Sequence, residues 1–222
     1  MPITTAIFDM DGLLIDSEPL WHEAFLEALS EWNITMSEAE YATSVGLRTR
    51  EFLQHWLPVF GLDLKLVPAV DAEITRLVKE KIKTRGQLLP GVPETLDKVR
   101  SRGLRVGLAS SSPISVINTT LDRAGLQGVF EHVASAEDLP FAKPHPQVYL
   151  DCAGALGAVQ VECLCFEDSF NGLIAAKAAR MRCVIVPAPH VFADARWGAA
   201  DIILPSLEQF TDEVLDSLLQ RR

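Results

Sequence analysis

The chain is poor in positive charge and has no long hydrophobic run. Its 222 residues include 20 Lys and Arg against 30 Asp and Glu, which gives a net charge of −10. This balance argues against a nucleic-acid partner, because phosphate backbones are bound by basic patches. No stretch approaches the ~18 apolar residues of a membrane span, so we expect no membrane partner either.

The first residues lack a basic leader followed by an apolar stretch and a small-residue cleavage site. Cysteine is also scarce, and two of the four cysteines, Cys163 and Cys165, stand two apart in a predicted strand, where pairing is awkward. We therefore expect a cytoplasmic protein whose cysteines are reduced and buried. No feature of the sequence argues for a subunit interface, so we expect a monomer.

Short apolar runs alternate with helical patterns along most of the chain. This repetition predicts an α/β fold, a doubly wound parallel sheet with helices on both faces. Ligands of such sheets bind at the carboxyl ends of the strands. The predicted strands are 4–8, 105–109, 132–135, 163–167, 183–186 and 202–204, and the predicted helices between them are 92–102, 114–124, 146–156 and 171–179.

One stretch interrupts this rhythm, because residues 17–86 contain helical patterns and no convincing strand. Ser37-Glu38-Ala39-Glu40 has the form of a capping box and predicts the start of a short helix. We predict an all-helical domain at 17–86, inserted into an α/β domain built from 1–16 and 87–222. An insert at this place would lie over the carboxyl ends of the strands as a lid. Its predicted helices are 18–32, one beginning at Ser37, 49–60 and 68–85.

The first predicted strand ends in Asp9-Met10-Asp11-Gly12. Two neighbouring carboxylates resist joint ionisation, and a bound cation removes that penalty. Mg²⁺ prefers hard oxygen ligands with one or two protein carboxylates, so the pattern indicates a metal-assisted site. An ordinary Asp-Gly turn is the alternative. A calcium loop is excluded, because Leu13 occupies the fifth position, where such a loop needs an acidic or amide side chain.

Three further polar clusters follow predicted strands. The hydroxyl of Ser110 and the backbone of Ser111 can hold phosphate oxygens, or simply cap a helix. Lys143, in a loop stiffened by prolines, can neutralise a phosphate and a carboxylate, or be a plain surface lysine. Glu167 and Asp168 can complete a metal shell, or cap the next helix. All these clusters fall on one edge of the sheet, and each supplies a different part of a phosphoryl-transfer site.

These clusters resemble the four motifs of the haloacid dehalogenase superfamily, and the resemblance spans the whole chain. The helical insert resembles the cap that this superfamily places after the first strand of its Rossmann-like core. Within the superfamily, the chain is similar to the bacterial hexitol and 2-deoxyglucose-6-phosphate phosphatases. The segments that carry this closer likeness are 7–19, 89–92, 143–146 and 178–181.

The resemblance implies a Mg²⁺-dependent sugar-phosphate phosphatase and assigns the chemistry to particular residues. Asp9 would be the nucleophile that forms an aspartyl-phosphate. Asp11 would be the general acid to the leaving group and then the general base to water. Mg²⁺ would be held by the Asp9 carboxylate, the Asp11 backbone carbonyl and Asp168, with Glu167 supporting that shell directly or through water.

The remaining implied contacts are to the phosphate and to the sugar. Ser110 and Ser111 would hold phosphate oxygens, and Lys143 would bridge the phosphate and the nucleophile. In the insert, we predict that Trp21 and Arg48 face the substrate, since a planar guanidinium can donate several hydrogen bonds to hydroxyls. Glu18, at the hinge, could accept from another hydroxyl. The partner is then a small phosphorylated sugar.

Two alternatives remain. Beta-phosphoglucomutases resemble the chain in Gly46-Leu47-Arg48, but they carry a histidine where this sequence has Trp21. His22 would point about 100° away around the helix, so hydrolysis is favoured over mutase activity. A non-catalytic binding protein is disfavoured, because none of the side chains implied in catalysis is missing.

Overall fold

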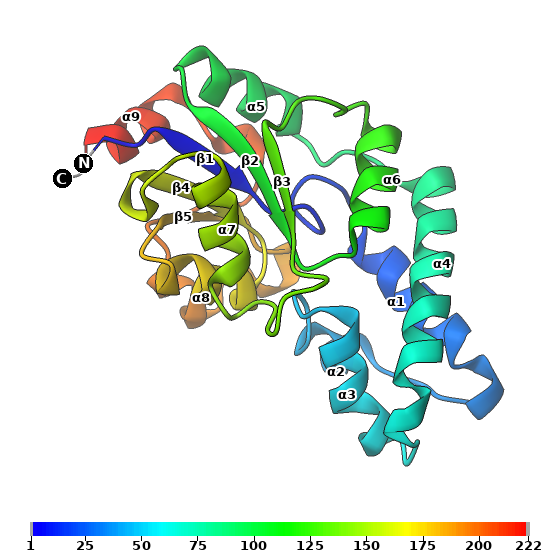
Figure 1. The fold of residues 1–222 in the computed structure, drawn as a ribbon. Helices are drawn as coiled ribbons and strands as arrows, with labels where there is room; N and C mark the ends of the chain where they lie inside the picture. The colour runs from blue at the N-terminus through cyan, green and yellow to red at the C-terminus, as the bar shows by residue number, and fades with distance from the viewer. Residues whose placement is uncertain (1, 221–222) are drawn as a thin grey trace.

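The computed structural model describes residues 2–220 and contains a six-stranded sheet (Figure 1). The strand order is β3-β2-β1-β4-β5-β6, and every neighbouring pair runs parallel. The predicted α/β class and doubly wound sheet are confirmed. The strands are β1 (Thr5–Phe8), β2 (Arg105–Ser110), β3 (His132–Ser135), β4 (Cys163–Glu167), β5 (Arg182–Ile185) and β6 (Ile202–Ile203).

Both faces of the sheet are covered by helices, as the alternation of side chains along a buried strand requires. On β1, Ala6 and Phe8 belong to one hydrophobic cluster, which includes residues of α5, α6 and α9. Ile7 belongs to the other, which includes residues of α7 and α8. These helices are α5 (Val92–Ser101), α6 (Ile114–Ala124), α7 (Gln147–Ala155), α8 (Phe170–Ala178) and α9 (Asp212–Gln220).

Residues 17–86, called the insert below, are helical, with α1 and α4 side by side and α2 and α3 beneath the sheet edge in the view of Figure 1. The capping box is present, because the Ser37 hydroxyl accepts from the Glu40 amide and the Glu40 carboxylate accepts from the Ser37 amide. Helix α4 also packs against α6 of the sheet region. The helices are α1 (Glu18–Ala28), α2 (Glu38–Ala42), α3 (Thr49–Val59) and α4 (Val67–Arg85).

The chain enters and leaves the insert at adjacent points. Ile15 and Leu88 form an antiparallel bridge, and the Asp16 amide donates to the Gln87 carbonyl at 3.0 Å. This pair of segments, called the neck below, keeps the insert directly beside the end of β1. The larger hydrophobic cluster runs through Leu14 into the insert, so the two regions share apolar packing.

Several details differ from the sequence-based expectation. The predicted helix 18–32 ends at Ala28 and is followed by a separate 3₁₀ turn, while α9 was not predicted.

The four cysteines are buried and unpaired, as expected. In the part of the chain that the structure describes, no helix combines the length and apolarity needed to cross a bilayer. The 3₁₀ turns are Ser30–Trp32, Leu64–Leu66, Gln160–Glu162, Pro189–Val191, Ala195–Ala199 and Leu207–Gln209.

Candidate active site

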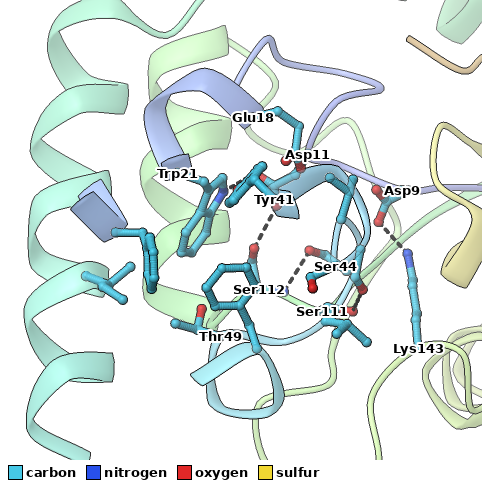
Figure 2. Close-up of a pocket in the computed structure, with 17 residues that line it drawn as sticks. Asp9, Asp11, Glu18, Trp21, Tyr41, Ser44, Thr49, Ser111, Ser112 and Lys143 are labelled. Atoms are coloured by element: carbon cyan, nitrogen blue, oxygen red, sulfur yellow. Dashed lines mark hydrogen bonds and ion pairs between the residues drawn. The ribbon is translucent and has the colours of Figure 1, made fainter. Parts of the chain in front are cut away.

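A buried lysine connects two of the strand ends. Lys143 is 2% exposed, and its Nζ donates to Asp9 Oδ1 (Figure 2). It also donates to Glu167 Oε1 at 2.6 Å and to the Ala109 carbonyl at 3.0 Å. Burial acts to lower the pKa of Lys143, but the adjacent carboxylates outweigh it and raise the pKa above its ordinary value. The lysine is therefore a fixed positive charge beside Asp9 at the end of β1.

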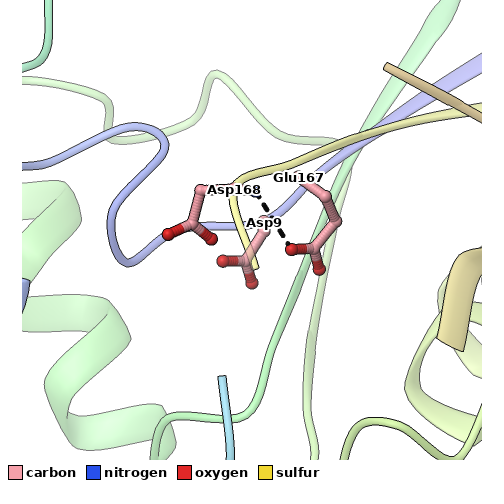
Figure 3. Close-up of side chains that lie close together, drawn as sticks. All are labelled: Asp9, Glu167 and Asp168. Atoms are coloured by element: carbon pink, nitrogen blue, oxygen red, sulfur yellow. Dashed lines mark hydrogen bonds between the residues drawn. The ribbon is translucent and has the colours of Figure 1, made fainter. Parts of the chain in front are cut away.

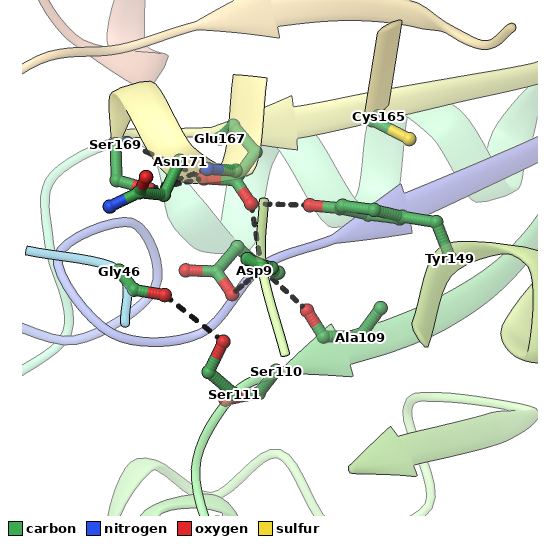
Figure 4. Close-up of polar contacts among 12 residues, drawn as sticks. Asp9, Gly46, Ala109, Ser110, Ser111, Tyr149, Cys165, Glu167, Ser169 and Asn171 are labelled. Carbon is green, nitrogen blue, oxygen red and sulfur yellow. Dashed lines mark hydrogen bonds and ion pairs between the residues drawn. The ribbon is translucent and has the colours of Figure 1, made fainter. Parts of the chain in front are cut away.

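Glu167, at the end of β4, is completely buried and holds this lysine in place. Its Oε1 accepts from Lys143 and from the Tyr149 hydroxyl (Figure 4). Its Oε2 accepts from the amides of Asp168 and Ser169, at 3.2 and 3.4 Å, and from the Ser169 hydroxyl at 3.2 Å. Burial, and next the charge of Glu167, raise the pKa of Tyr149, so its hydroxyl remains a donor.

Three buried carboxylates meet at this edge of the sheet. One oxygen each of Asp9, Glu167 and Asp168 lies within 4.8 Å of the others (Figure 3). Burial raises the pKa values of Asp9 and Asp168. Repulsion from Glu167 adds to both shifts, Asp11 adds to the shift of Asp9, and Asp9 and Glu18 add to the shift of Asp168. The charge of Lys143 opposes both shifts.

The cluster fits a divalent cation with oxygen ligands. It offers carboxylate oxygens, which Mg²⁺ prefers, and a cation would relieve the repulsion that raises the pKa values. Gly12, with φ of +73°, makes room for the Asp168 carboxylate, because a Cβ there would lie 2.2 Å from Asp168 Oδ2. Gly12 is therefore needed both for the positive φ of the turn and for the close approach of the Asp168 carboxylate.

The second aspartate of the motif is held by three donors. Asp11 Oδ1 accepts from the Ser17 hydroxyl at 2.6 Å and from the Trp21 indole at 2.9 Å. Asp11 Oδ2 accepts from the Ser112 hydroxyl at 2.7 Å (Figure 2). The carboxylate is thus fixed jointly by the insert's first helix and by the loop after β2.

The serines after β2 line the pocket in front of these carboxylates. Ser110 is 1% exposed, and its hydroxyl accepts from the Ser112 amide at 3.0 Å. Ser111 donates from its hydroxyl to the Gly46 carbonyl at 3.1 Å (Figure 4). The predicted phosphate-binding serines therefore lie at the pocket, and one of them contacts the insert.

The insert forms the opposite wall of the pocket. Its polar members Glu18, Trp21 and Tyr41 lie near Asp11 in Figure 2. Burial, and next the charge of Asp11, raise the pKa of Glu18 to about 8, while a hydrogen bond from Tyr41 opposes the shift. The Glu18 Oε2 atom is buried and has no hydrogen-bond partner among the described residues. The apolar members of this wall are Phe25, Val45, Leu47, Phe52 and Ile74.

Arg48, which we predicted to face the substrate, is engaged elsewhere. Its Nη1 donates to the carbonyls of Ala136, Glu137 and Leu139 at 2.8, 3.0 and 2.8 Å, and its Nη2 donates to Glu51 Oε1 at 3.0 Å. Arg48 is not among the described residues that line the pocket, whereas the other predicted phosphate- and sugar-contacting residues are. The structure therefore does not bring Arg48 together with the rest of the predicted site.

Comparison with known proteins agrees with this geometry. The family model of the haloacid dehalogenase-like hydrolases matches residues 3–180. The chain belongs to this hydrolase family. It is 45% identical over 213 residues to hexitol phosphatase B of Escherichia coli K12, covering 94% of this chain and 95% of that protein. It is also 32% identical over 176 residues to the phosphorylated carbohydrates phosphatase of Thermotoga maritima, covering 78% and 80% of the two chains.

Solved structures of the hydrolase family share its fold. The beta-phosphoglucomutase of Clostridium difficile superposes with a TM-score of 0.85 at 23% identity, covering 97% of this chain and 96% of that one. CbbY of Rhodobacter sphaeroides, solved in complex with phosphate, superposes with a TM-score of 0.83 at 21% identity, covering 94% and 96%. At these identities the likeness establishes the fold of the hydrolase and not its substrate.

Sequence reasoning missed several groups that the hydrolase fold brings to the site. Ser17 and Ser112 hold Asp11, Tyr149 holds Glu167, and Tyr41 contacts Glu18. Ser112 carried a weak signal as the last residue of the Ser110–Ser112 run. The two tyrosines carried none, because their contacts depend on how α7 and α2 pack.

Proposed function

We propose that this hydrolase is a Mg²⁺-dependent phosphatase of hexose and hexitol phosphates, 2-deoxyglucose 6-phosphate among them. The observation that carries the proposal is the position of Lys143 Nζ, which donates to both Asp9 and Glu167 beside a third carboxylate, Asp168. Such a group neutralises an entering phosphate next to a nucleophile. The names of the two phosphatases reported above support the sugar-phosphate class.

The proposed reaction has two displacements at phosphorus. In the first, a carboxylate oxygen of Asp9 forms a bond to phosphorus, the bond to the sugar oxygen breaks, and Asp11 gives its proton to that oxygen. In the second, Asp11 takes a proton from water, the water oxygen bonds to phosphorus, and the bond to Asp9 breaks. Free phosphate leaves, and both aspartates return to their initial state.

The other residues of the site have positioning roles in this proposal. Ser110 and the backbone of Ser111 hold phosphate oxygens, and Lys143 bridges the phosphate and Asp9. The Asp9 carboxylate, the Asp11 backbone carbonyl and Asp168 would hold Mg²⁺, and Glu167 would support this shell directly or through water. When bound, the metal offsets the repulsion between the phosphate and the carboxylates.

The insert, residues 17–86, acts in this proposal as a cap domain on the core formed by 1–16 and 87–222. It would exclude water from the pocket and present Glu18 and Trp21 to the sugar. Trp21 occupies the place where the mutases that the chain resembles carry a histidine, and its indole donates to Asp11. That arrangement favours hydrolysis of the aspartyl-phosphate over transfer of its phosphoryl group to a second hydroxyl of the sugar. We also propose that the enzyme acts as a cytoplasmic monomer.

Phosphate release from a panel of hexose, hexitol, nucleotide and two-carbon phosphates tests the proposal, with Mg²⁺ and with EDTA. Asp9→Asn serves as the blank. Metal-dependent turnover that favours hexose or hexitol 6-phosphates is expected. Conversion of a hexose 1-phosphate to its 6-isomer without phosphate release would instead identify a mutase, and no reaction with any ester would identify a binding protein.

A further inference from the structure

The segment of the insert between α2 and α3 contacts the core at three places, one of them in the first turn of α8. The Val45 carbonyl accepts from Asn171 Nδ2 at 2.8 Å, and the Gly46 carbonyl accepts from the Ser111 hydroxyl at 3.1 Å (Figure 4). Asn171 follows β4 and Ser111 follows β2. The third contact is to residues 136–142, called the lysine loop here because it leads from β3 to Lys143.

Arg48 binds the first part of the lysine loop. It is 8% exposed, and its single Nη1 atom donates to the three carbonyls of Ala136, Glu137 and Leu139. Hydrogen bonds from a charged donor are stronger than those between neutral groups. One guanidinium from the insert therefore binds three backbone carbonyls within residues 136–139.

Glu51 binds the last part of the same loop. Its Oε1 accepts from Arg48 Nη2 at 3.0 Å and from the Ala142 amide at 3.2 Å. Ala142 is the residue immediately before Lys143 in the sequence. Arg48 and Glu51, three residues apart at the start of α3, thus hold both ends of the lysine loop from the insert's side.

The core supports the loop mainly near its two ends. The Glu137 carboxylate accepts from the Ile114 amide at 3.0 Å, and Ala136 and Ala142 are buried in the smaller hydrophobic cluster. The first residue of the loop is fixed, because the Ala136 amide donates to the Ser110 carbonyl at 2.9 Å. Further along, Phe141 is 63% exposed, and the Leu139 amide donates only within the loop, to Ala136. Exposed segments with few contacts open at low free-energy cost, so the contacts from the insert should add measurably to the order of this loop.

We infer that Arg48 and Glu51 are positioning residues that couple the seating of the insert to the placement of Lys143 beside Asp9. The inference rests on the proposed function for the role of Lys143. It replaces the substrate contact predicted for Arg48 from the sequence, because a sugar hydroxyl would have to displace three carbonyl acceptors. Closing the insert then orders the cation that the phosphate needs.

The test compares Arg48→Ala and Glu51→Ala with the matched control Arg50→Ala. Arg50 is exposed and stands two residues from Arg48, so the control removes the same charge from the same segment. Hydrogen–deuterium exchange of residues 136–142 is measured in the intact protein without substrate. Steady-state kcat and KM are measured with an aryl phosphate and with a hexitol phosphate.

In Arg48→Ala, exchange of the lysine loop should accelerate about tenfold or more, since bonds to a charged donor are lost. Exchange of β2 should stay unchanged, and kcat should fall by the same factor for both substrates, with the ratio of their KM values unchanged. Glu51→Ala should accelerate exchange at Ala142, which keeps the inference testable if Arg48→Ala does not fold. Arg50→Ala should change none of these quantities.

Unchanged exchange of the loop in both variants would overturn the inference. A rise of KM confined to the hexitol phosphate would overturn it as well, and would return Arg48 to a substrate contact. If the wild-type enzyme hydrolyses neither ester, the proposed function fails, while the exchange measurement still decides whether the insert orders the lysine loop.

Discussion

Replacing Glu18 by Gln should stabilise the protein at neutral and alkaline pH. Burial raises the pKa of Glu18 from an ordinary 4.5 to about 8. Between these pH values, the folded protein keeps a proton that the unfolded chain releases. The free energy of unfolding contributed by this group therefore falls as the pH rises, because the native state binds more protons than the unfolded state.

The size of the effect follows from the shift. Each pKa unit corresponds to about 1.4 kcal/mol, so wild-type protein should lose about 3 kcal/mol relative to Glu18→Gln between pH 4.5 and pH 7. Gln does not titrate, and its carbonyl oxygen can still accept from Tyr41. Asp9 and Asp168 are present in both proteins, but the charge of Glu18 adds to the raised pKa of Asp168, so Gln also reduces that shift and acts in the same direction.

Urea unfolding in EDTA at pH 5, 7 and 9 measures the difference between the two proteins. The control is Glu23→Gln on the same helix, where a 48% exposed carboxylate pairs with Arg85 and its pKa is lowered. The pH dependence of the Glu23 contribution has the opposite sign. Because its pKa is lowered in the folded protein, Glu23 stabilises the protein above the pKa of the unfolded chain, and this stabilisation is lost as the pH falls. The change in this control should stay within about 1 kcal/mol. A Glu18→Gln advantage of equal size at pH 5 and pH 9 would refute the reasoning.

Three further changes test the rest of the site. Trp21→Phe removes one of the three donors to Asp11, so kcat for an aryl phosphate should fall about tenfold, as expected for a bond to a charged acceptor; an unchanged kcat would contradict a positioning role of the indole. Tyr149→Phe removes the hydroxyl that donates to Glu167 and should lower the free energy of unfolding by about 2 kcal/mol in urea; a loss within experimental error would show that this contact contributes nothing. Mg²⁺ at a hundred times its dissociation constant should stabilise the protein by about 2.7 kcal/mol in thermal unfolding; the same gain in Asp168→Asn would place the metal elsewhere.

The architecture could be predicted from the sequence because each central strand is a short apolar run followed by polar residues. Strands such as Thr5–Phe8 and Cys163–Glu167 are buried on both faces of the sheet. Such a strand can be recognised from its own sequence, without knowing which segments pack against it. Helix α9 was missed, although Leu215 and Leu218 are buried, because helices were predicted only between strands and α9 follows the last predicted strand.

The site was predictable only where the backbone itself places the side chain. Asp9, Ser110 and Glu167 stand at strand ends, so the topology of a parallel sheet is sufficient to bring them to one edge. Arg48 immediately precedes α3 and Tyr149 lies in α7, and the orientation of these helices depends on tertiary packing. Their carbonyl and carboxylate partners are far away in the sequence, and no local pattern records such a pairing.

The neck has a consequence for how this enzyme could be rebuilt. Ile15 and Leu88 lie side by side, so the two ends of the insert leave the core at adjacent points. Any inserted segment therefore has to span the same short distance, whatever its length. The entropy of closing a loop grows only slowly with its length, so exchanging the whole helical segment for that of another hydrolase should cost the sheet little. What such a chimaera must supply anew is the packing around Leu14 and a side chain that reaches the lysine loop. In this architecture, the insert can therefore be changed without a large loss in the stability of the core.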